Sequence, residues 1–279
     1  MKLEFVKMQG AGNDYIYFDC LKNEIANPNE LSIKVSDRHF GIGGDGIVLI
    51  CKSNVADAKM RMFNIDGSEG KMCGNAIRCV GKYLYDNKIT DKTEISIETL
   101  SGIKYLSLNI ENDKVDSIKV DMGMAILEPS KIPALVAGDT AINIVINAGN
   151  KDYNATLVSM GNPHCIIFTK NIDEICIENI GKLFEHHKLF PEGINTEFVE
   201  VIDENTLKMR VWERGSGETL ACGTGSCAVA VAAVLNGICK IDSDIRIKLI
   251  GGELIIKYTK KTVYMTGKAE KVFQGVVEV

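Results

Sequence analysis

Hydrophobic residues recur with helical spacing in two stretches of the chain. Ile77, Val80 and Leu84 stand at i, i+3 and i+7, which predicts an amphipathic helix. Residues 225–235 are apolar on nearly every side and are followed by Asn236-Gly237, a common helix stop. A helix that is apolar all round needs other elements around it. The pattern therefore predicts a sheet wrapped around a central helix.

Strand patterns follow each of these helices. Alternating apolar residues occur at 95–97, 106–110 and 118–122 after the first helix, and at 245–249, 254–258 and 263–265 after the second. Turn residues separate them at Asn112-Asp113 and Gly251-Gly252. Each half therefore reads as α+β, with a mainly antiparallel sheet or barrel wrapped around one central α-helix.

The two halves also match in sequence at a fixed offset of 222 − 73 = 149 residues. At this offset Met72-Cys73-Gly74 falls on Ala221-Cys222-Gly223, Asn64 on Glu213, Glu69 on Glu218, Gly12-Asn13 on Gly161-Asn162, and Gly102 on Gly251. So many coincidences at one offset indicate an old internal duplication. We expect two pseudo-symmetric domains, residues 1–123 and 124–267, with the tail 268–279 returning to the first domain as an edge strand.

Composition narrows the class of partner. A net charge of −5 and 46% hydrophobic residues favour a small polar substrate, because a nucleic-acid binder needs a basic excess. The first residues form no apolar signal segment and the longest apolar run is residues 228–235, so we expect a cytoplasmic protein with no membrane partner. The nine cysteines form no CxxC, which speaks against a disulfide framework and against a metal site.

Two of the cysteines occupy equivalent positions at predicted helix starts. The free N–H groups and the positive dipole end at a helix start favour a thiolate, so we expect a lowered pKa at Cys73 and Cys222. Gly74 and Gly223 leave the adjoining backbone open to an anion such as a carboxylate. A lone cysteine beside glycine is more often a small buried hydrophobe, and the other seven cysteines keep that interpretation.

A pair of facing thiols suits the inversion of a stereocentre. If the two halves face each other across a cleft, a carbon bound there has a sulfur on each side. One thiolate removes the α-proton, the opposite thiol returns a proton to the other face, and the helix ends stabilise the carboxylate as it gains enolate character. Cys73 and Cys222 are therefore the candidate catalytic residues, and this chemistry needs no cofactor.

Six segments of the sequence resemble one known family. They are residues 7–14 (KMQGAGND), 63–69 (FNIDGSE), 73–79 (CGNAIRC), 161–164 (GNPH), 213–219 (ERGSGET) and 222–225 (CGTG). Together they resemble the diaminopimelate epimerases, and the match runs from about residue 3 to the C-terminus. The resemblance implies conversion of LL-2,6-diaminopimelate to the meso isomer without pyridoxal phosphate or metal, in lysine and peptidoglycan supply. It also implies a homodimer.

The resemblance further assigns roles to individual residues. It makes Cys73 and Cys222 the acid and base, and places the reacting carboxylate on the backbone at Gly74-Asn75 and Gly223-Thr224. The residues that it implies bind the rest of the substrate are Asn13, Asn64, Asn162, Asn195, Glu213 and Arg214. Amides and a guanidinium suit the distal amino-acid group, which needs donors for its carboxylate and acceptors for its ammonium. His164 and Glu213 resemble the pair that adjusts the cysteine pKa values.

One position departs from the family pattern. Some members carry a substrate-contacting Gln where this chain has Gly46, within Gly41-Ile42-Gly43-Gly44-Asp45-Gly46. The stretch fits GxGxxG, but a polar segment precedes it instead of an apolar strand, so a dinucleotide site is not expected. We interpret it as a turn that borders the cleft.

Three alternatives stay open at this stage. A proline or hydroxyproline racemase keeps both cysteines, although Asn64, Asn195 and Arg214 would then face no second amino-acid group. A dithiol redox sensor would use the same two thiols to form a reversible disulfide. A binding module would need neither thiol.

Overall fold

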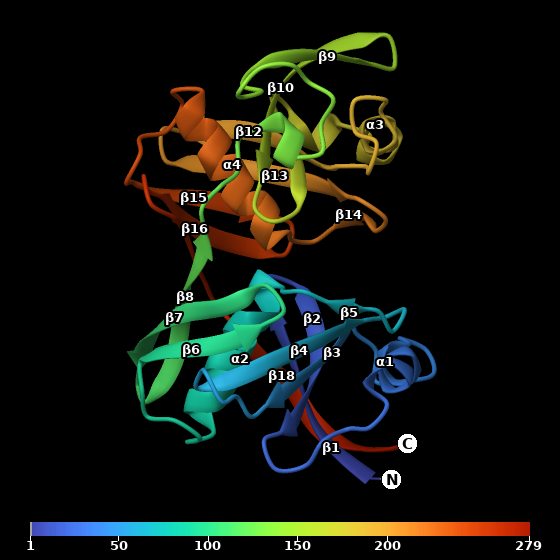
Figure 1. The fold of residues 1–279 in the computed structure, drawn as a ribbon, viewed down its shortest axis with the longest axis vertical. Helices are drawn as coiled ribbons and strands as arrows, with labels where there is room; N and C mark the ends of the chain where they lie inside the picture. The colour runs from blue at the N-terminus through green and yellow to red at the C-terminus, as the bar shows by residue number, and fades with distance from the viewer. Residues whose placement is uncertain (1) are drawn as a thin grey trace. The chain divides into compact units, whose positions relative to one another are not determined.

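The structure is a computed structural model that describes residues 2–279, and it divides into two compact units (Figure 1). Unit 1 comprises Met1–Asp121 and Thr266–Val279, and unit 2 comprises Met122–Met265. The boundaries expected from the repeat lie two residues farther along, at 123 and 267 (123 − 121 and 267 − 265). The last strand belongs to unit 1, where it pairs with the first strand.

Unit 1 is a strongly bent sheet with two helices packed against it. Its elements are β1 (Lys2–Gly10), β2 (Asn13–Cys20), α1 (Pro28–Ser36), β3 (Gly46–Cys51), β4 (Ala58–Asn64), β5 (Glu69–Gly70), α2 (Gly74–Asp86), β6 (Glu94–Thr99), β7 (Gly102–Glu111), β8 (Lys114–Gly123) and β18 (Glu270–Glu278). The strands pair in the order β18-β1-β2-β3-β4-β6-β7-β8. Only β2–β3 and β4–β6 are parallel.

Unit 2 contains the remaining elements. They are η1 (Pro129–Lys131), β9 (Ile144–Ala148), β10 (Lys151–Ser159), β11 (Pro163–Thr169), η2 (Ile172–Glu174), α3 (Ile177–Glu185), β12 (Asn195–Asp203), β13 (Thr206–Glu213), β14 (Gly217–Thr219), α4 (Gly223–Leu235), β15 (Asp244–Leu249), β16 (Gly252–Tyr258) and β17 (Val263–Gly267). The pairing order β9-β10-β11-β12-β13-β15-β16 repeats that of unit 1 from β18 to β7. The two parallel pairs, β11–β12 and β13–β15, also recur at the equivalent places.

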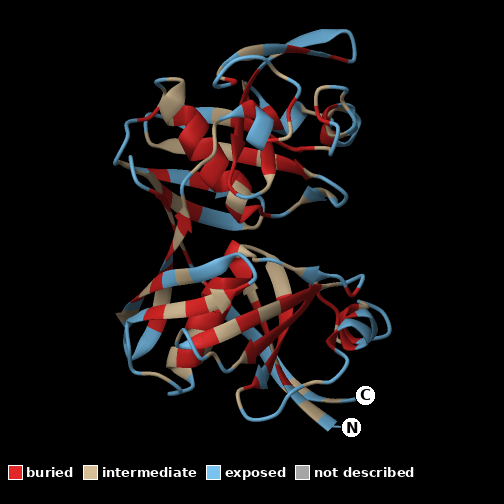
Figure 2. Cartoon of the chain, viewed as in Figure 1, coloured by how far each residue is buried: buried red, intermediate tan, exposed pale blue. Residues whose placement is uncertain are grey.

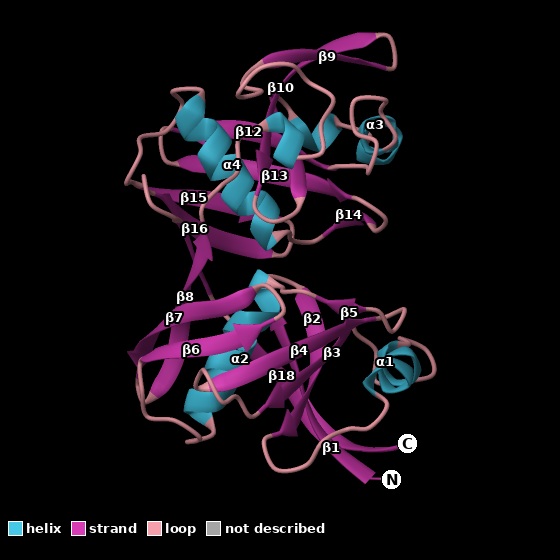
Figure 3. Ribbon diagram, in the orientation of Figure 1, coloured by secondary structure: helices cyan, strands magenta, loops and turns pink. Residues whose placement is uncertain are grey.

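Each unit has its own central helix, as the hydrophobic pattern predicts (Figure 3). Helix α2 packs against β1, β2 and β7, and α4 packs against β10, β11, β12, β15 and β16. The bounds of α2 and α4 differ by the same 149 residues at both ends (223 − 74 and 235 − 86). Figure 2 shows α4 buried along most of its length. The predicted α+β class is confirmed.

The hydrophobic pattern missed two short helices, α1 and α3. Each has nine residues and packs on the outer side of its sheet, α1 on β3 and β4 and α3 on β12 and β13. Helix α1 has too few apolar positions for a clear period, whereas α3 does carry helical spacing at Ile177, Ile180 and Phe184, so its pattern could have been read from the sequence. None of the helices within residues 2–279 is long and apolar enough to cross a membrane.

Buried thiols predict a loss of stability at alkaline pH. Burial raises the pKa of Cys79 from 9.0 to about 11, and it raises the pKa of Cys165 and Cys222 well above 9.0. The unfolded chain therefore releases protons above pH 9 that the folded chain keeps. This contribution to stability is fully present below pH 9 and is lost as the pH rises. Cys79 alone accounts for a loss of about 2 kcal/mol by pH 10.5 and of about 3 kcal/mol once the pH is well above 11.

Urea unfolding of reduced protein between pH 8 and pH 10.5 measures this loss. We expect a progressively lower free energy of unfolding, and a shallower decline in a Cys79→Ala variant. A free energy of unfolding that stays constant across this range contradicts the prediction.

Candidate active site

Cys73 occupies the N-cap position of α2. Its backbone is extended (φ −132°, ψ 122°), and its sulfur accepts a hydrogen bond from the backbone N–H of Ala76 at 3.5 Å. The thiol also donates to Asn13 Oδ1, at the start of β2, over 3.3 Å. Cys73 is half-buried.

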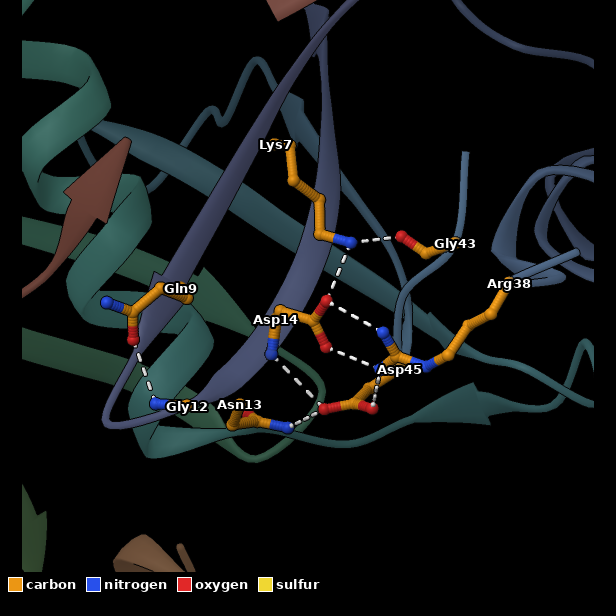
Figure 4. Close-up of polar contacts among 8 residues, drawn as sticks. All are labelled: Lys7, Gln9, Gly12, Asn13, Asp14, Arg38, Gly43 and Asp45. Carbon is orange, nitrogen blue, oxygen red and sulfur yellow. Dashed lines mark hydrogen bonds and ion pairs between the residues drawn. The ribbon is translucent and has the colours of Figure 1, made fainter. Parts of the chain in front are cut away.

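Asn13 is held by a network of charged side chains (Figure 4). Its Nδ2 donates to Asp45 Oδ2 at 2.7 Å, and Asp45 Oδ1 accepts from Arg38 Nη2 at 2.9 Å. Arg38 also makes a two-pronged contact with Asp14, at 2.7 and 3.2 Å, and Lys7 Nζ lies 2.6 Å from Asp14 Oδ2. Two cations thus balance two carboxylates. We call Asn13, Asp45, Cys73 and Asn75 the Cys73 half-site.

Cys222 occupies the equivalent N-cap position of α4. Its backbone is again extended (φ −123°, ψ 112°), and its sulfur accepts from the N–H of Gly225 at 3.4 Å. Thr224 Oγ1 lies 3.5 Å from the same sulfur. Cys222 is buried, with 5% of its surface exposed, which distinguishes it from Cys73. The two cysteines therefore share a backbone geometry and differ in access to water.

The prediction that the pKa of Cys222 is lowered is wrong. Burial raises the pKa of Cys222 well above 9.0, and the carboxylates of Glu213 and Glu197 raise it further. Hydrogen bonds from Thr224 and Gly225 act in the opposite direction but are weaker. The helix end alone cannot compensate for the removal of a thiolate from water next to two carboxylates. Cys222 is consequently a thiol in this state.

A buried histidine and glutamate lie beside Cys222. His164 Nδ1 is 2.7 Å from Glu197 Oε1, and both side chains are completely buried. His164 Nε2 is 3.0 Å from Asn162 Oδ1, so the imidazole bridges Asn162 and Glu197. We call Asn162, His164, Glu197, Cys222 and Thr224 the Cys222 half-site.

The other polar residues of unit 2 tie the end of β13 to the start of β12. Asn195 Nδ2 donates to the carbonyl of Pro163 at 2.8 Å, and its Oδ1 accepts from the backbone N–H of Arg214 at 2.9 Å. The Arg214 guanidinium donates to the carbonyl of Glu192 at 2.7 Å. Glu213 Oε1 accepts from the Thr219 hydroxyl at 2.5 Å. Asn195 thus fixes the backbone from which Arg214 projects.

The remaining predicted residues of unit 1 lie in two settings. Asn75 is buried in the first turn of α2, and its Oδ1 has no hydrogen-bond partner among residues 2–279. Asn64 ends β4 and donates to Ser68 Oγ at 3.0 Å. At Gly46, a Cβ would lie 2.0 Å from the carbonyl oxygen of Phe63 with φ at +152°, so this backbone accepts only glycine. The backbone at this position therefore leaves no room for the Gln side chain that some members of the family carry.

Two supporting residues, Asp45 and Glu197, were not among those expected from the sequence. Asp45 accepts a hydrogen bond from Asn13, and Glu197 lies 2.7 Å from His164, so each fixes a group of its half-site. The sequence did hold one sign of the role of Glu197, since this charged residue stands on the same face of its strand as Asn195 and Val199, which are buried. Among residues 2–279, no group of three His, Cys, Asp or Glu side chains is arranged to hold a metal ion.

Comparison with known sequences gives a full-length match. A sequence model of the family described as diaminopimelate epimerase matches residues 5–128 and 156–272. A curated diaminopimelate epimerase of Methanococcus maripaludis is 57% identical over 279 residues, covering 99% of this chain and 100% of the relative. One from Acetivibrio thermocellus is 55% identical, with 99% of each chain covered.

Solved structures share the fold at much lower identity. The hydroxyproline epimerase of Agrobacterium vitis, solved with bound trans-4-hydroxy-L-proline, superposes with a TM-score of 0.72 and 14% identity, covering 99% of this chain and 92% of that one. At this identity the likeness describes the fold alone. It supports the two-unit α+β architecture.

Proposed function

Because this chain belongs to the diaminopimelate epimerase family, we propose that it interconverts LL- and meso-2,6-diaminopimelate by moving a proton at one α-carbon between two thiols. The observation that carries the proposal is the duplicated cap geometry. Cys73 and Cys222 are N-caps of helices with equivalent bounds, and each sulfur accepts from the N–H three residues later. The enzyme is an isomerase, and the two thiols of its proposed site hold equivalent backbone positions in the two units.

The proposed reaction brings both half-sites to one substrate carbon. The α C–H bond breaks, the proton passes to one sulfur, and the electron pair spreads into the carboxylate. The opposite thiol then gives its proton to the other face of the carbon. The carboxylate is stabilised by the open N–H groups at Gly74-Asn75 and Gly223-Thr224 as its charge grows. After one turnover the protonation states of the two cysteines are exchanged.

The burial of Cys222 fits the acid role in one direction of this reaction. Its surroundings keep the thiol protonated, so it is ready to give a proton to a carbanion. Cys73 is more exposed than Cys222, so we assign it the base role in the same direction. In the reverse reaction Cys222 must act as the base and Cys73 as the acid. The positive charge of the substrate ammonium favours the loss of the Cys222 proton.

We further propose that Asn64, Asn195, Glu213 and Arg214 recognise the distal amino-acid group. Arg214 carries an exposed guanidinium on a backbone that Asn195 fixes, so it can bind the distal carboxylate. The carboxylate of Glu213 can bind the distal ammonium. A proline-like substrate lacks both groups. The site would then bind it more weakly, because the groups that recognise the distal end would find no partner on the substrate.

Reduced protein incubated with LL-diaminopimelate and no added cofactor tests this function. Chiral chromatography should show the meso isomer, while L-proline and trans-4-hydroxy-L-proline stay unchanged in parallel reactions. Turnover of a proline substrate without turnover of diaminopimelate would reassign the protein to the racemases.

We also propose that the protein acts in the cytoplasm as a homodimer, a state that the family resemblance supports. Light scattering on purified protein should give twice the 30.6 kDa of one chain. A mass of one chain at micromolar concentration contradicts the dimer and leaves the proposed reaction untouched.

A further inference from the structure

We propose that Asp45 is a positioning residue for Cys73: by accepting from the Asn13 amide, it turns Asn13 Oδ1 toward the thiol, so that Cys73 keeps its proton until substrate binds. The inference depends on the proposed function at one point only, namely that the Cys73 proton takes part in the reaction. Its structural basis lies entirely within unit 1.

The orientation of the Asn13 amide follows from the charge of its neighbour. Asp45 Oδ2 lies 2.7 Å from Asn13 Nδ2 and also accepts from the backbone N–H of Asp14 at 3.2 Å. A flipped amide would place two acceptor oxygens in contact with no hydrogen between them. Arg38 holds the second Asp45 oxygen and favours its ionised form, while burial and Asp14 raise the Asp45 pKa. An ionised Asp45 therefore permits only one amide orientation.

This orientation has a direct chemical consequence at the sulfur. Asn13 Oδ1, 3.3 Å from Cys73 Sγ, can accept a hydrogen bond from a thiol but repels a thiolate. The reverse orientation would present an NH2 group and stabilise the thiolate. The network thus opposes the helix N–H of Ala76, which favours the thiolate.

Two other titratable groups that interact with Cys73 are uncharged near neutral pH. Tyr17, on β2, interacts electrostatically with Cys73, and burial raises its pKa well above 10.0. Cys79, on α2, does the same, and burial raises its pKa to about 11. Lys7 and Arg38 offset Asp14 and Asp45. Replacing Asp45 by a neutral residue therefore leaves a net positive cluster, which also favours the thiolate.

The second unit shows that this arrangement is specific to Cys73. Asn162 is equivalent to Asn13 in the repeat, but its Oδ1 is occupied by His164 Nε2 at 3.0 Å. No carboxylate holds the amide nitrogen of Asn162 within residues 2–279. The Oδ1 atoms of the two equivalent amides therefore have different partners, a thiol in unit 1 and a histidine in unit 2.

Alkylation of the two cysteines by iodoacetamide tests the proposal. The reduced protein is titrated with pH without substrate, and mass spectrometry reads the Cys73 and Cys222 peptides separately. In Asp45→Asn we expect the alkylation midpoint of Cys73 to fall by about one pH unit, which is a tenfold rise in thiolate below the midpoint. The Cys222 midpoint should stay unchanged. Asp113→Asn, the same change in an exposed turn, is the matched control.

A second variant separates the relay from a simple charge effect. Asn13→Ala keeps the ion pairs of Asp14, Arg38 and Asp45 and should lower the Cys73 midpoint as well. If Asp45 acts through Asn13, Asp45→Asn should shift the Cys73 midpoint clearly less in the Asn13→Ala background than in the original protein, and an equal shift in both backgrounds overturns the proposal. An unchanged Cys73 midpoint in folded Asp45→Asn, or in Asn13→Ala if Asp45→Asn does not fold, overturns the proposal. Because no substrate is present, this result is independent of whether diaminopimelate is epimerised.

Discussion

Replacement of Cys73 or Cys222 by alanine should lower the rate of epimerisation by about a thousandfold or more, while the fold stays intact. Loss of one general acid or base typically costs a factor of a hundred to ten thousand, roughly, and full inversion needs both groups in each turnover. Structural cost is small because the helix caps lose only weak sulfur contacts of 3.5 and 3.4 Å. The measurement is the initial rate of meso isomer formation, with circular dichroism as the check of folding.

Cys176→Ala is the matched control for these variants. Cys176 is exposed and precedes α3, away from either cap position. It should keep the full rate. Unchanged epimerisation in Cys73→Ala or in Cys222→Ala would remove that cysteine from the mechanism and sink the two-thiol account.

Replacement of Glu197 by alanine should destabilise the protein by about 3 kcal/mol or more. The change removes one member of a completely buried pair and leaves His164 Nδ1 with no acceptor at 2.7 Å. It also removes side-chain volume next to Gly225, where a Cβ would already lie 2.6 Å from Glu197 Oε1. Urea unfolding measures the loss, and Glu204→Ala, an exposed turn position, should change the free energy of unfolding by less than about 0.5 kcal/mol.

Glu197→Gln separates charge from packing in the same pair. The amide keeps the volume and can bond His164, so most of the stability should remain. Without the carboxylate, the pKa of Cys222 should fall, because Glu197 is one of the groups that raise it. A downward shift of the Cys222 alkylation midpoint measures this change. If the midpoint instead stays unchanged, Glu197 serves only the packing of β12.

The sequence predicted the elements whose patterns are long and regular. The apolar run that ends at Asn236-Gly237 forms α4, and the stripe of Ile77, Val80 and Leu84 lies on the buried face of α2. The repeat predicted that both cysteines hold equivalent places, and the caps confirm this geometry. Periodicity and self-similarity are properties of the chain itself, so they can be read without coordinates.

The supporting residues and the protonation of Cys222 could not be predicted in this way. Asp45 and Asn13 are 32 residues apart and meet only because β2 and β3 pair in parallel. His164 and Glu197 meet through the parallel pairing of β11 and β12. Burial decides the pKa of Cys222, and burial depends on packing that no local pattern records.

Incubation of the reduced protein with LL-diaminopimelate in deuterium oxide, without added cofactor, tests the central claim most directly. Two thiols that exchange their protons with solvent should place deuterium at the α-carbon as the meso isomer forms, and proton NMR should show the α-proton signal disappearing at the same time. Formation of the meso isomer with the original proton retained, or no exchange in protein shown to be folded and reduced, would contradict proton transfer by Cys73 and Cys222.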